Sequence, residues 1–260
     1  AFVLEEFEIR KPLIIPENPE GISLELSFDP QDRSLCIQSR PEGSTSWSVH
    51  AVGSLRAERV ESGFETAQWT EPSAVLDPVD VEENYEHKRS RGLPYGPEFR
   101  SARRIFARDG RSAGEVSLSE KAEPRATEYA LHPVILDGSL HVFSAAARTV
   151  EGRGVKLKLP VRFSRILFLQ SPGASALTRT EVLRCNEEMT EGRIEIFDRE
   201  GRPCVLVDGF RAISLSSARR AGSSTGEGRE LVYHVDWERR PCEGEVAAIA
   251  PEPLSTLHEA

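Results

Sequence analysis

One long apolar helix, in a chain whose other segments look like strands, limits the fold more than any other feature. Residues 134–148 are the one long segment with helical spacing of apolar side chains, and Leu136, Leu140, Phe143 and Ala147 share one stripe of it. A sheet that curls around such a helix buries the helix on all sides and one face of the sheet. Residues 134–148 are therefore the candidate for a central helix of the fold.

Short runs with strand-like alternation occupy much of the remaining chain. In the first of them Ile22, Leu24, Leu26 and Phe28 alternate with polar residues, the period of a half-buried strand. Turn signals such as Asp109-Gly110 separate several runs, so the pattern indicates antiparallel meanders and not alternating βαβ units. The other predicted strands are 34–39, 47–55, 101–107, 114–118, 165–169, 176–183, 193–198 and 203–213.

The predicted central helix carries a carboxylic acid and an imidazole one turn apart. Asp137 and His141 are four residues apart and therefore share a face of the helix. Such a pair can serve acid–base chemistry when the helix is buried. The residues alone also allow a simpler interpretation, in which Asp137 favours the helix N-terminus electrostatically and His141 is a hydrogen-bonded core residue.

Two motifs in a fixed order carry a family resemblance. The first is Tyr95-Gly96-Pro97-Glu98-Phe99, which follows a short helical stretch at 79–88, and the second is LHPVILDGSLH, which ends at His141. Together they resemble the dehydratase domain of modular polyketide synthases, whose motifs are Tyr-Gly-Pro-x-Phe and Leu-His-Pro-x-x-Leu-Asp-x-x-x-Gln/His. The segment Lys158-Leu159-Pro160-Val161 looks like the family's downstream Leu-Pro segment. The resemblance covers most of residues 1–215.

The resemblance implies an α+β fold, a double hot-dog in which each unit wraps an antiparallel sheet around a central helix. Residues 1–77 would be the C-terminal part of the first hot-dog unit, and 78–216 would be the second. Residues 217–230 are rich in Ser, Gly and Arg and indicate a flexible linker. Residues 231–260 are similar to the start of the ketoreductase region that often follows, and are too few to hold a core.

The predicted first unit has strands but no helix. In the family, the catalytic His lies in a His-x-x-x-Gly-x-x-x-x-Pro motif, and none of the six histidines fits it. His50, for example, is followed by Gly at the third position and not the fourth. We therefore expect an incomplete first hot-dog whose missing stretch precedes residue 1, and an inactive chain when it stands alone.

The resemblance assigns roles in the removal of water from a 3-hydroxyacyl thioester. A base takes a proton from the carbon next to the carbonyl, and an acid protonates the departing hydroxyl. Asp137 would be the acid, because burial among apolar neighbours favours a protonated carboxyl group. His141 would hydrogen-bond Asp137 and orient it, while a role as a second acid–base group stays open.

The first motif would supply substrate-binding residues. The resemblance places Tyr95 and Gly96 in the substrate channel, with Pro97, Phe99 and Leu136 beside them, although a core Tyr beside a tight turn fits the residues equally well. The acyl group would arrive on the phosphopantetheine arm of an acyl carrier protein, with no cofactor bound directly.

The family also implies protein partners. Carrier proteins are acidic, so the basic residues Arg100, Arg103 and Arg104 form a candidate docking site for one. The neighbouring ketosynthase, acyltransferase and ketoreductase domains are further implied partners, as is a second copy in a homodimer.

Composition excludes several other classes. A net charge of −9 argues against a non-specific nucleic-acid binder, and no segment approaches the ~20 apolar residues of a membrane span. The four cysteines Cys36, Cys185, Cys204 and Cys242 lack zinc-site spacing and indicate buried thiols in a reducing, cytoplasmic compartment. We therefore predict neither a metal site nor a nucleotide loop.

Two other functions stay open. The chain could be a non-catalytic double hot-dog that serves as a scaffold or dimerisation element, which an upstream region without the His motif would favour. It could also be an enoyl isomerase or a cyclase with the same fold. Such domains tend to differ at the Asp position, whereas Asp137 is present.

Overall fold

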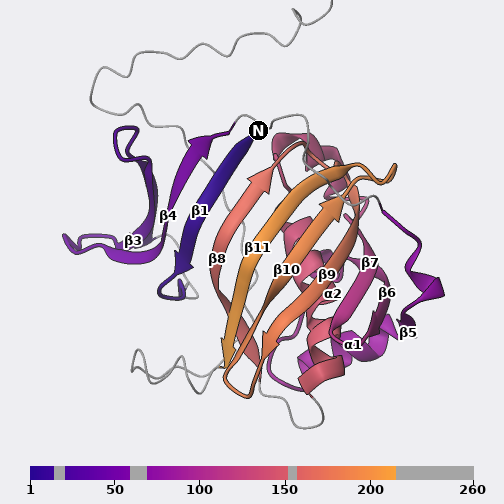
Figure 1. Cartoon of the computed structure of the whole chain (residues 1–260). Helices are drawn as coiled ribbons and strands as arrows, with labels where there is room; N and C mark the ends of the chain where they lie inside the picture. Colours follow the sequence, from indigo (N-terminus) through magenta and orange to yellow (C-terminus); the bar gives the residue numbers. More distant parts are fainter. Residues whose placement is uncertain (15–20, 59–68, 152–156, 215–260) are drawn as a thin grey trace, which may run out of the picture. The chain divides into compact units, whose positions relative to one another are not determined.

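The computed structural model describes residues 1–14, 21–58, 69–151 and 157–214, which form an eleven-stranded antiparallel sheet and two α-helices (Figure 1). The strand order is β2-β3-β4-β1-β8-β11-β10-β9-β7-β6-β5. The helices are α1 (Val81–Arg89) and α2 (Pro133–Glu151). The strands are β1 (Phe2–Ile9), β2 (Ile22–Phe28), β3 (Ser34–Pro41), β4 (Ser48–Ala57), β5 (Asp77–Val79), β6 (Ala102–Arg108), β7 (Arg111–Ser117), β8 (Lys158–Phe168), β9 (Ser175–Cys185), β10 (Met189–Phe197) and β11 (Pro203–Ser214).

The predicted arrangement of one long helix against antiparallel strands is confirmed. The helix expected at 134–148 is α2, and the strands expected from the alternating pattern are all present. The strand expected at 165–169 is longer, because β8 begins at Lys158 and includes Pro160. Pro160 lies opposite Ala212 at a register shift in β11, where a residue without an N–H group is tolerated. The predicted linker and ketoreductase segment, 217–260, lie outside the described residues.

Strand β1 joins the two parts of the sheet and was not predicted. It pairs with β4 on one side and with β8 on the other. Strand β1 is acidic, but arginine side chains of the neighbouring strands neutralise its carboxylates. Glu5 lies 2.9 Å from Arg56 of β4, and Glu8 lies 3.0 Å from Arg162 of β8. A charged strand can therefore lie inside the sheet because its partners supply the opposite charge.

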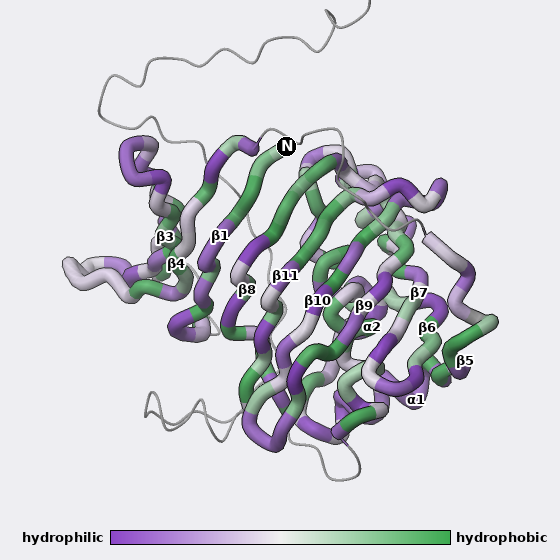
Figure 2. The backbone as a smooth tube through the Cα atoms, in the orientation of Figure 1, coloured by the Kyte–Doolittle hydropathy of each residue, from purple (hydrophilic) through white to green (hydrophobic). Residues whose placement is uncertain are grey.

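The core lies between α2 and the strands β6, β7, β9 and β10, against which the helix packs. Ile135, Val142 and Ala146 on α2 are fully buried. Figure 2 shows hydrophobic stretches that recur in the neighbouring strands β8, β11 and β10. Burial of this apolar surface is the main favourable contribution to folding.

Glycines allow α2 to approach the sheet closely. A Cβ atom on Gly138 of α2 would overlap Val116 of β7 and the hydroxyl of Ser101. In the sheet, a Cβ atom on Gly192 would overlap Phe143 of α2. Gly138 therefore lets α2 lie close to β7 and so sets the distance of its neighbour Asp137 from the sheet.

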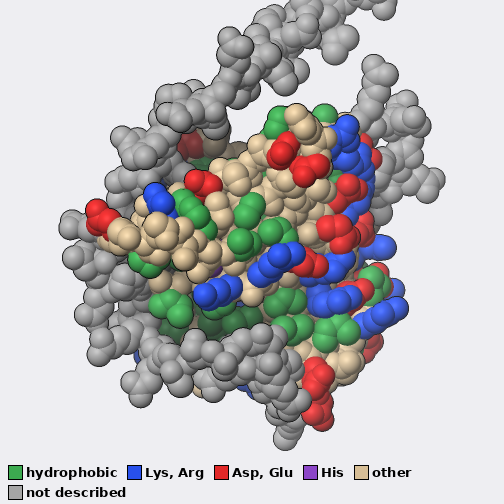
Figure 3. Space-filling view, turned by 90° about the vertical axis from the view of Figure 1, so that its left-hand side faces the viewer, with side chains coloured by type: hydrophobic (Ala, Val, Ile, Leu, Met, Phe, Trp, Pro, Cys, Tyr) green, Lys and Arg blue, Asp and Glu red, His purple; other side chains and the backbone are tan. Residues whose placement is uncertain are grey.

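The strands β2, β3 and β4 form a part of the sheet whose apolar side chains are more exposed than those around α2. Leu24, Leu26 and Phe28 are 41%, 52% and 44% exposed, so β2 is a strand as predicted but its apolar face is not half-buried. Before β5, the described residues contain no α-helix that could cover this face. Figure 3 faces this side of the molecule and shows hydrophobic side chains at its surface.

Three of the four cysteines, and both α-helices, can be compared with what the composition indicated. Cys36, Cys185 and Cys204 are free thiols, and Cys242 lies outside the described residues. Within the described part of the chain, neither α1 nor α2 is long and apolar enough to cross a membrane.

The close approach of α2 predicts an unusual response to a helix-favouring substitution. Replacing Gly by Ala in a helix interior normally stabilises it by about 1 kcal/mol. Gly138→Ala should instead lower the free energy of unfolding by about 1–3 kcal/mol, because the new methyl group overpacks the contact with Val116 and Ser101. Urea unfolding measures the difference, and Gly21→Ala, at a glycine with open space around it, is the control. An unchanged or raised stability of Gly138→Ala would contradict the close contact.

Candidate active site

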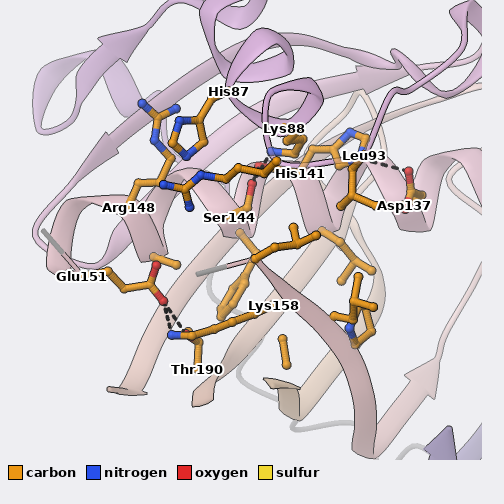
Figure 4. Close-up of a pocket in the computed structure, with 18 of the residues that line it drawn as sticks. His87, Lys88, Leu93, Asp137, His141, Ser144, Arg148, Glu151, Lys158 and Thr190 are labelled. Carbon is orange, nitrogen blue, oxygen red and sulfur yellow. Dashed lines mark hydrogen bonds and ion pairs between the residues drawn. The ribbon is translucent and has the colours of Figure 1, made fainter. Parts of the chain in front are cut away.

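Two helices from different parts of the chain meet at one pocket. Helix α1 begins after Asp80, whose carboxylate accepts a hydrogen bond from the backbone N–H of Glu83 at 2.9 Å. Helix α2 begins at Pro133, a residue suited to a first helical turn. The pocket is lined by the last turn of α1, by one face of α2 and by the start of β8 (Figure 4).

Asp137 and His141 face each other across one turn of α2, as the spacing predicts. Nε2 of His141 lies 3.0 Å from Oδ2 of Asp137. Both atoms are buried, and neither has another polar partner in the described part of the chain. The His141 side chain is 3% exposed and that of Asp137 is 28% exposed, so the carboxyl group is the more accessible of the two.

A third residue, Tyr85 of α1, contacts this pair and was not predicted from sequence. Its hydroxyl lies 3.2 Å from Nδ1 of His141 and accepts a hydrogen bond from the backbone N–H of Ala102 at 3.0 Å. The rings of Tyr85 and Tyr95 both meet the imidazole edge to face, at centroid distances of 5.3 and 4.3 Å. His141 is therefore held on two sides by aromatic rings.

Burial sets the protonation of these groups. It lowers the pKa of His141 below its usual value, an effect that the neighbouring Asp137 carboxylate only partly offsets. Burial likewise raises the pKa of Tyr85 and that of Tyr95. Near neutral pH the site therefore contains a neutral imidazole beside two protonated phenols.

A basic group lies one turn further along the pocket. The ammonium group of Lys88, which is 8% exposed, donates to Ser144 Oγ at 2.6 Å and to Asn84 Oδ1 at 3.4 Å. Burial and the nearby Arg148 guanidinium lower the pKa of Lys88 to about 7. Sequence reasoning missed this residue because a lysine on a short helix normally lies on its solvated face.

The far end of the pocket is closed by a buried ion pair. Glu151, at the end of α2, pairs with Lys158 at the start of β8, and each side chain is 7% exposed. Thr190 joins them, donating to Glu151 and accepting from Lys158, each at 2.7 Å. Glu151 is fourteen residues from Asp137, so the pocket extends about 21 Å along the helix axis. Between these ends its wall includes the apolar residues Leu140, Phe143 and Ala147.

Comparison with known proteins identifies this arrangement. The family model described as "Polyketide synthase dehydratase N-terminal domain" matches residues 65–222, which include α1, both motifs and α2. The chain belongs to the polyketide synthase dehydratase family.

Curated relatives of this dehydratase-family chain are large synthases. Mycoketide-CoA synthase of Mycobacterium tuberculosis is 27% identical over 256 residues, or 97% of this chain and 6% of the relative. Polyketide synthase GfsE of Streptomyces halstedii is 30% identical over 252 residues, or 92% of this chain and 6% of the relative. The chain therefore spans only a small fraction of the length of these relatives.

Solved structures confirm the hot-dog fold. "GphF Dehydratase 1" has a TM-score of 0.69 at 20% identity, covering 82% of this chain and 75% of that one. The "Dehydratase domain from CurF module of Curacin polyketide synthase" has a TM-score of 0.69 at 24% identity, covering 82% of this chain and 76% of that one. The division into residues 1–77 and 78–216 stays a prediction.

The structure brings some of the predicted substrate-binding residues of this dehydratase-family chain to the pocket and not others. Tyr95 lines the pocket beside Asp137 and His141. Gly96 is exposed and has open space where a Cβ atom would lie, Pro97 begins a 3-10 turn, and Phe99 is 42% exposed. Leu136 is half-buried on α2, and Leu140, one turn later, lies on the pocket wall instead.

Two further histidines, His50 and His87, lie in different parts of the fold. His50 lies on β4, where its ring nitrogens are 2.7 Å from Ser39 Oγ and 3.0 Å from the carbonyl oxygen of Lys11, and it does not line the pocket. His87 lines the pocket from α1. Within the described residues, no cluster of three or more His, Cys, Asp or Glu side chains could hold a metal ion.

Lys88 should make stability depend on pH. Its folded pKa of about 7 is below the ordinary value of 10.5, so between these two values the unfolded chain binds a proton that the folded chain does not. Stability contributed by Lys88 therefore rises with pH across this window. Relative to Lys88→Met, the free energy of unfolding of the wild type should rise by about 3–4 kcal/mol from pH 7 to pH 10.

Urea unfolding at both pH values measures this difference. The exposed Lys121→Met is the control, and its difference from the wild type should stay the same at both pH values. A pH-independent difference for Lys88→Met would show that Lys88 is not buried as an ammonium group.

Proposed function

We propose that this chain supplies the acid of a dehydratase that removes water from a carrier-bound 3-hydroxyacyl thioester. Asp137 is the acid, and the observation that carries the proposal is its contact with the buried His141 at the open end of an apolar pocket. Family membership supports the same reaction class. The product is a 2,3-enoyl thioester.

The elimination needs two proton movements. A base takes the proton from C2, the electrons of that C–H bond form the C2–C3 double bond, and the C3–O bond breaks. Asp137 donates a proton to the departing hydroxyl oxygen, which leaves as water instead of hydroxide. We assign the base to a residue outside the described part of the chain, because no histidine of the sequence lies in a His-x-x-x-Gly-x-x-x-x-Pro motif.

The pocket gives the acyl chain a direction. With the hydroxyl group at Asp137, the remaining acyl chain lies along α2 against Leu140, Phe143 and Ala147. Tyr95 lies beside the reacting carbons, and the Glu151–Lys158 pair closes the far end. The thioester then extends away from α2 toward a phosphopantetheine arm, which the chain binds as part of its substrate and not as a resident cofactor.

Asp137→Asn should abolish water loss, because an amide donates no proton to the hydroxyl. The chain, extended at its N-terminus by a segment with the family's His-x-x-x-Gly-x-x-x-x-Pro motif, is given a carrier-bound 3-hydroxyacyl thioester. Water loss is followed by mass spectrometry. The substitution should lower the rate by roughly 10²–10⁴-fold. Asp208→Asn, which changes an exposed partner of Arg193, is the matched control and should retain activity.

The same assay separates the other two functions. No turnover by a folded, extended wild-type protein would point to a scaffold. A substrate with a second hydroxyl group that yields a shifted double bond or an oxygen ring would point to an isomerase or a cyclase. Full activity of Asp137→Asn would overturn the assignment of the acid.

We further propose an acyl carrier protein as the partner, docked near Arg103. Arg100 pairs with Glu82, and Arg104 with Glu115 and Glu71. Arg103, in contrast, donates only to Ser117, and no carboxylate of the described residues lies within ion-pair distance of it. Arg103 also follows Ala102, the residue that holds Tyr85, so this charge lies close to the site. We also propose that neighbouring synthase domains and a second copy in a homodimer are partners of the chain, and that the protein is cytoplasmic.

Arg103→Glu should weaken carrier docking without changing the chemistry. We expect KM for a carrier-bound substrate to rise by about tenfold, the effect of losing one charge pair at an interface rim and adding a repulsion. The kcat value, and the KM for a small-molecule thioester, should not change. Arg193→Glu, at another exposed arginine, is the control. An unchanged KM of Arg103→Glu at low ionic strength would rule out docking at this surface.

A further inference from the structure

Tyr85 connects the backbone of β6 to the imidazole that contacts the acid. Three polar contacts follow one another, from the N–H of Ala102 to Tyr85 Oη at 3.0 Å, from Oη to His141 Nδ1 at 3.2 Å, and from His141 Nε2 to Asp137 Oδ2 at 3.0 Å. Tyr85 and His141 are 5% and 2% exposed, so water does not compete for these atoms. Figure 4 shows the last of the three contacts.

The direction of the hydrogen bonds is fixed by the first of them. A backbone N–H can only donate, so Oη of Tyr85 accepts from Ala102. The phenolic proton is then free for Nδ1 of His141, since Oη has no other acceptor nearby among the described residues. An imidazole that accepts at Nδ1 carries its own proton on Nε2 when it is neutral. Nε2–H therefore faces Oδ2 of Asp137.

The opposite tautomer leaves a buried proton without a partner. With the proton on Nδ1, the imidazole donates to Tyr85 and the phenolic O–H has no acceptor. Such unsatisfied buried donors are rare in folded proteins. Charged side chains also lie around the contact between Tyr85 and His141. Asp137 and Lys88 act on the imidazole, and Arg100 and Arg103 act on the phenol. None of them offers an acceptor to the Tyr85 hydroxyl in the described part of the chain.

We propose that Tyr85 is a positioning residue, which holds His141 in the Nε2–H tautomer and so aims the proton of Asp137 at the substrate. Because Nε2–H faces Oδ2 at 3.0 Å, the acidic proton of Asp137 belongs on the other oxygen, Oδ1. The first half of this proposal concerns the folded chain alone. The second half rests on the proposed dehydratase function.

Nitrogen chemical shifts of the imidazole test the first half directly. In the ¹⁵N-labelled 260-residue chain, the wild type should show an unprotonated Nδ1 and a protonated Nε2 for His141, assigned by their loss in His141→Gln. Tyr85→Phe should move Nδ1 toward the protonated value. It should also raise the midpoint of the His141 titration, because the lost O–H donor favours the neutral ring. Tyr129→Phe, beside His132, is the control and should leave His141 unchanged.

The wild-type spectrum alone can overturn the proposal. A protonated Nδ1 in the wild type contradicts the assigned tautomer, even if Tyr85→Phe does not fold. Shifts of His141 that are identical in the wild type and in a folded Tyr85→Phe variant contradict the role of Tyr85.

Turnover of the upstream-extended protein tests the second half. Tyr85→Phe should lower kcat by about tenfold, comparable to one hydrogen bond, with KM unchanged. In a His141→Gln background, where no tautomer has to be chosen, the same change should have little further effect. Equal effects in both backgrounds would show a structural role only. An extended wild type without turnover would refute the proposed function while leaving the spectroscopic result intact.

Discussion

The packing of α2 against the sheet is the constraint on which the rest of the structure depends. One side of the helix is buried by Ile135, Val142 and Ala146, and Gly138 and Gly192 let it lie close to the strands. The neighbouring side of the helix, which faces the start of β8, is then left to line the pocket. Because both faces belong to one rigid helix, any change in how α2 meets the sheet also moves Asp137. Stability and chemistry are coupled in this fold through the position of a single helix.

Much of this arrangement could be predicted from sequence, and what could not has a physical reason. Asp137 and His141 were predicted to face each other because a contact between residues four apart on a helix is local. The partner of His141 was not predicted, because Tyr85 is 56 residues away and reaches it only through the packing of α1 beside β6. Strand β1 was missed for the same reason, since its carboxylates are neutralised by arginines from β4 and β8 that the local pattern does not reveal.

The positions of the expected substrate-binding residues were predicted less well than the contact between Asp137 and His141. A motif gives the identity of its residues, but their orientation depends on the turn that follows. Tyr95 contacts His141, whereas Gly96 and Phe99, on either side of the turn that begins at Pro97, are exposed. Leu140 lines the pocket although Leu136 was expected to, because the pocket follows α2 toward Glu151 and away from its first turn. The wall of a pocket depends on tertiary packing more than on the motif that marks it.

The placement of polar groups weighs against a purely structural role for this domain. Tyr85, Lys88, Asp137 and His141 gather where α1 meets α2, next to an apolar core. Apolar residues of similar volume there would avoid the desolvation of an ammonium group and of an imidazole, and a scaffold would gain stability from them. A reaction needs the opposite, namely a neutral imidazole of fixed orientation and a carboxyl group that is accessible from the pocket. Folded proteins keep polar groups that lower local stability mainly where chemistry requires them. In this chain, that place is the Asp137 end of α2.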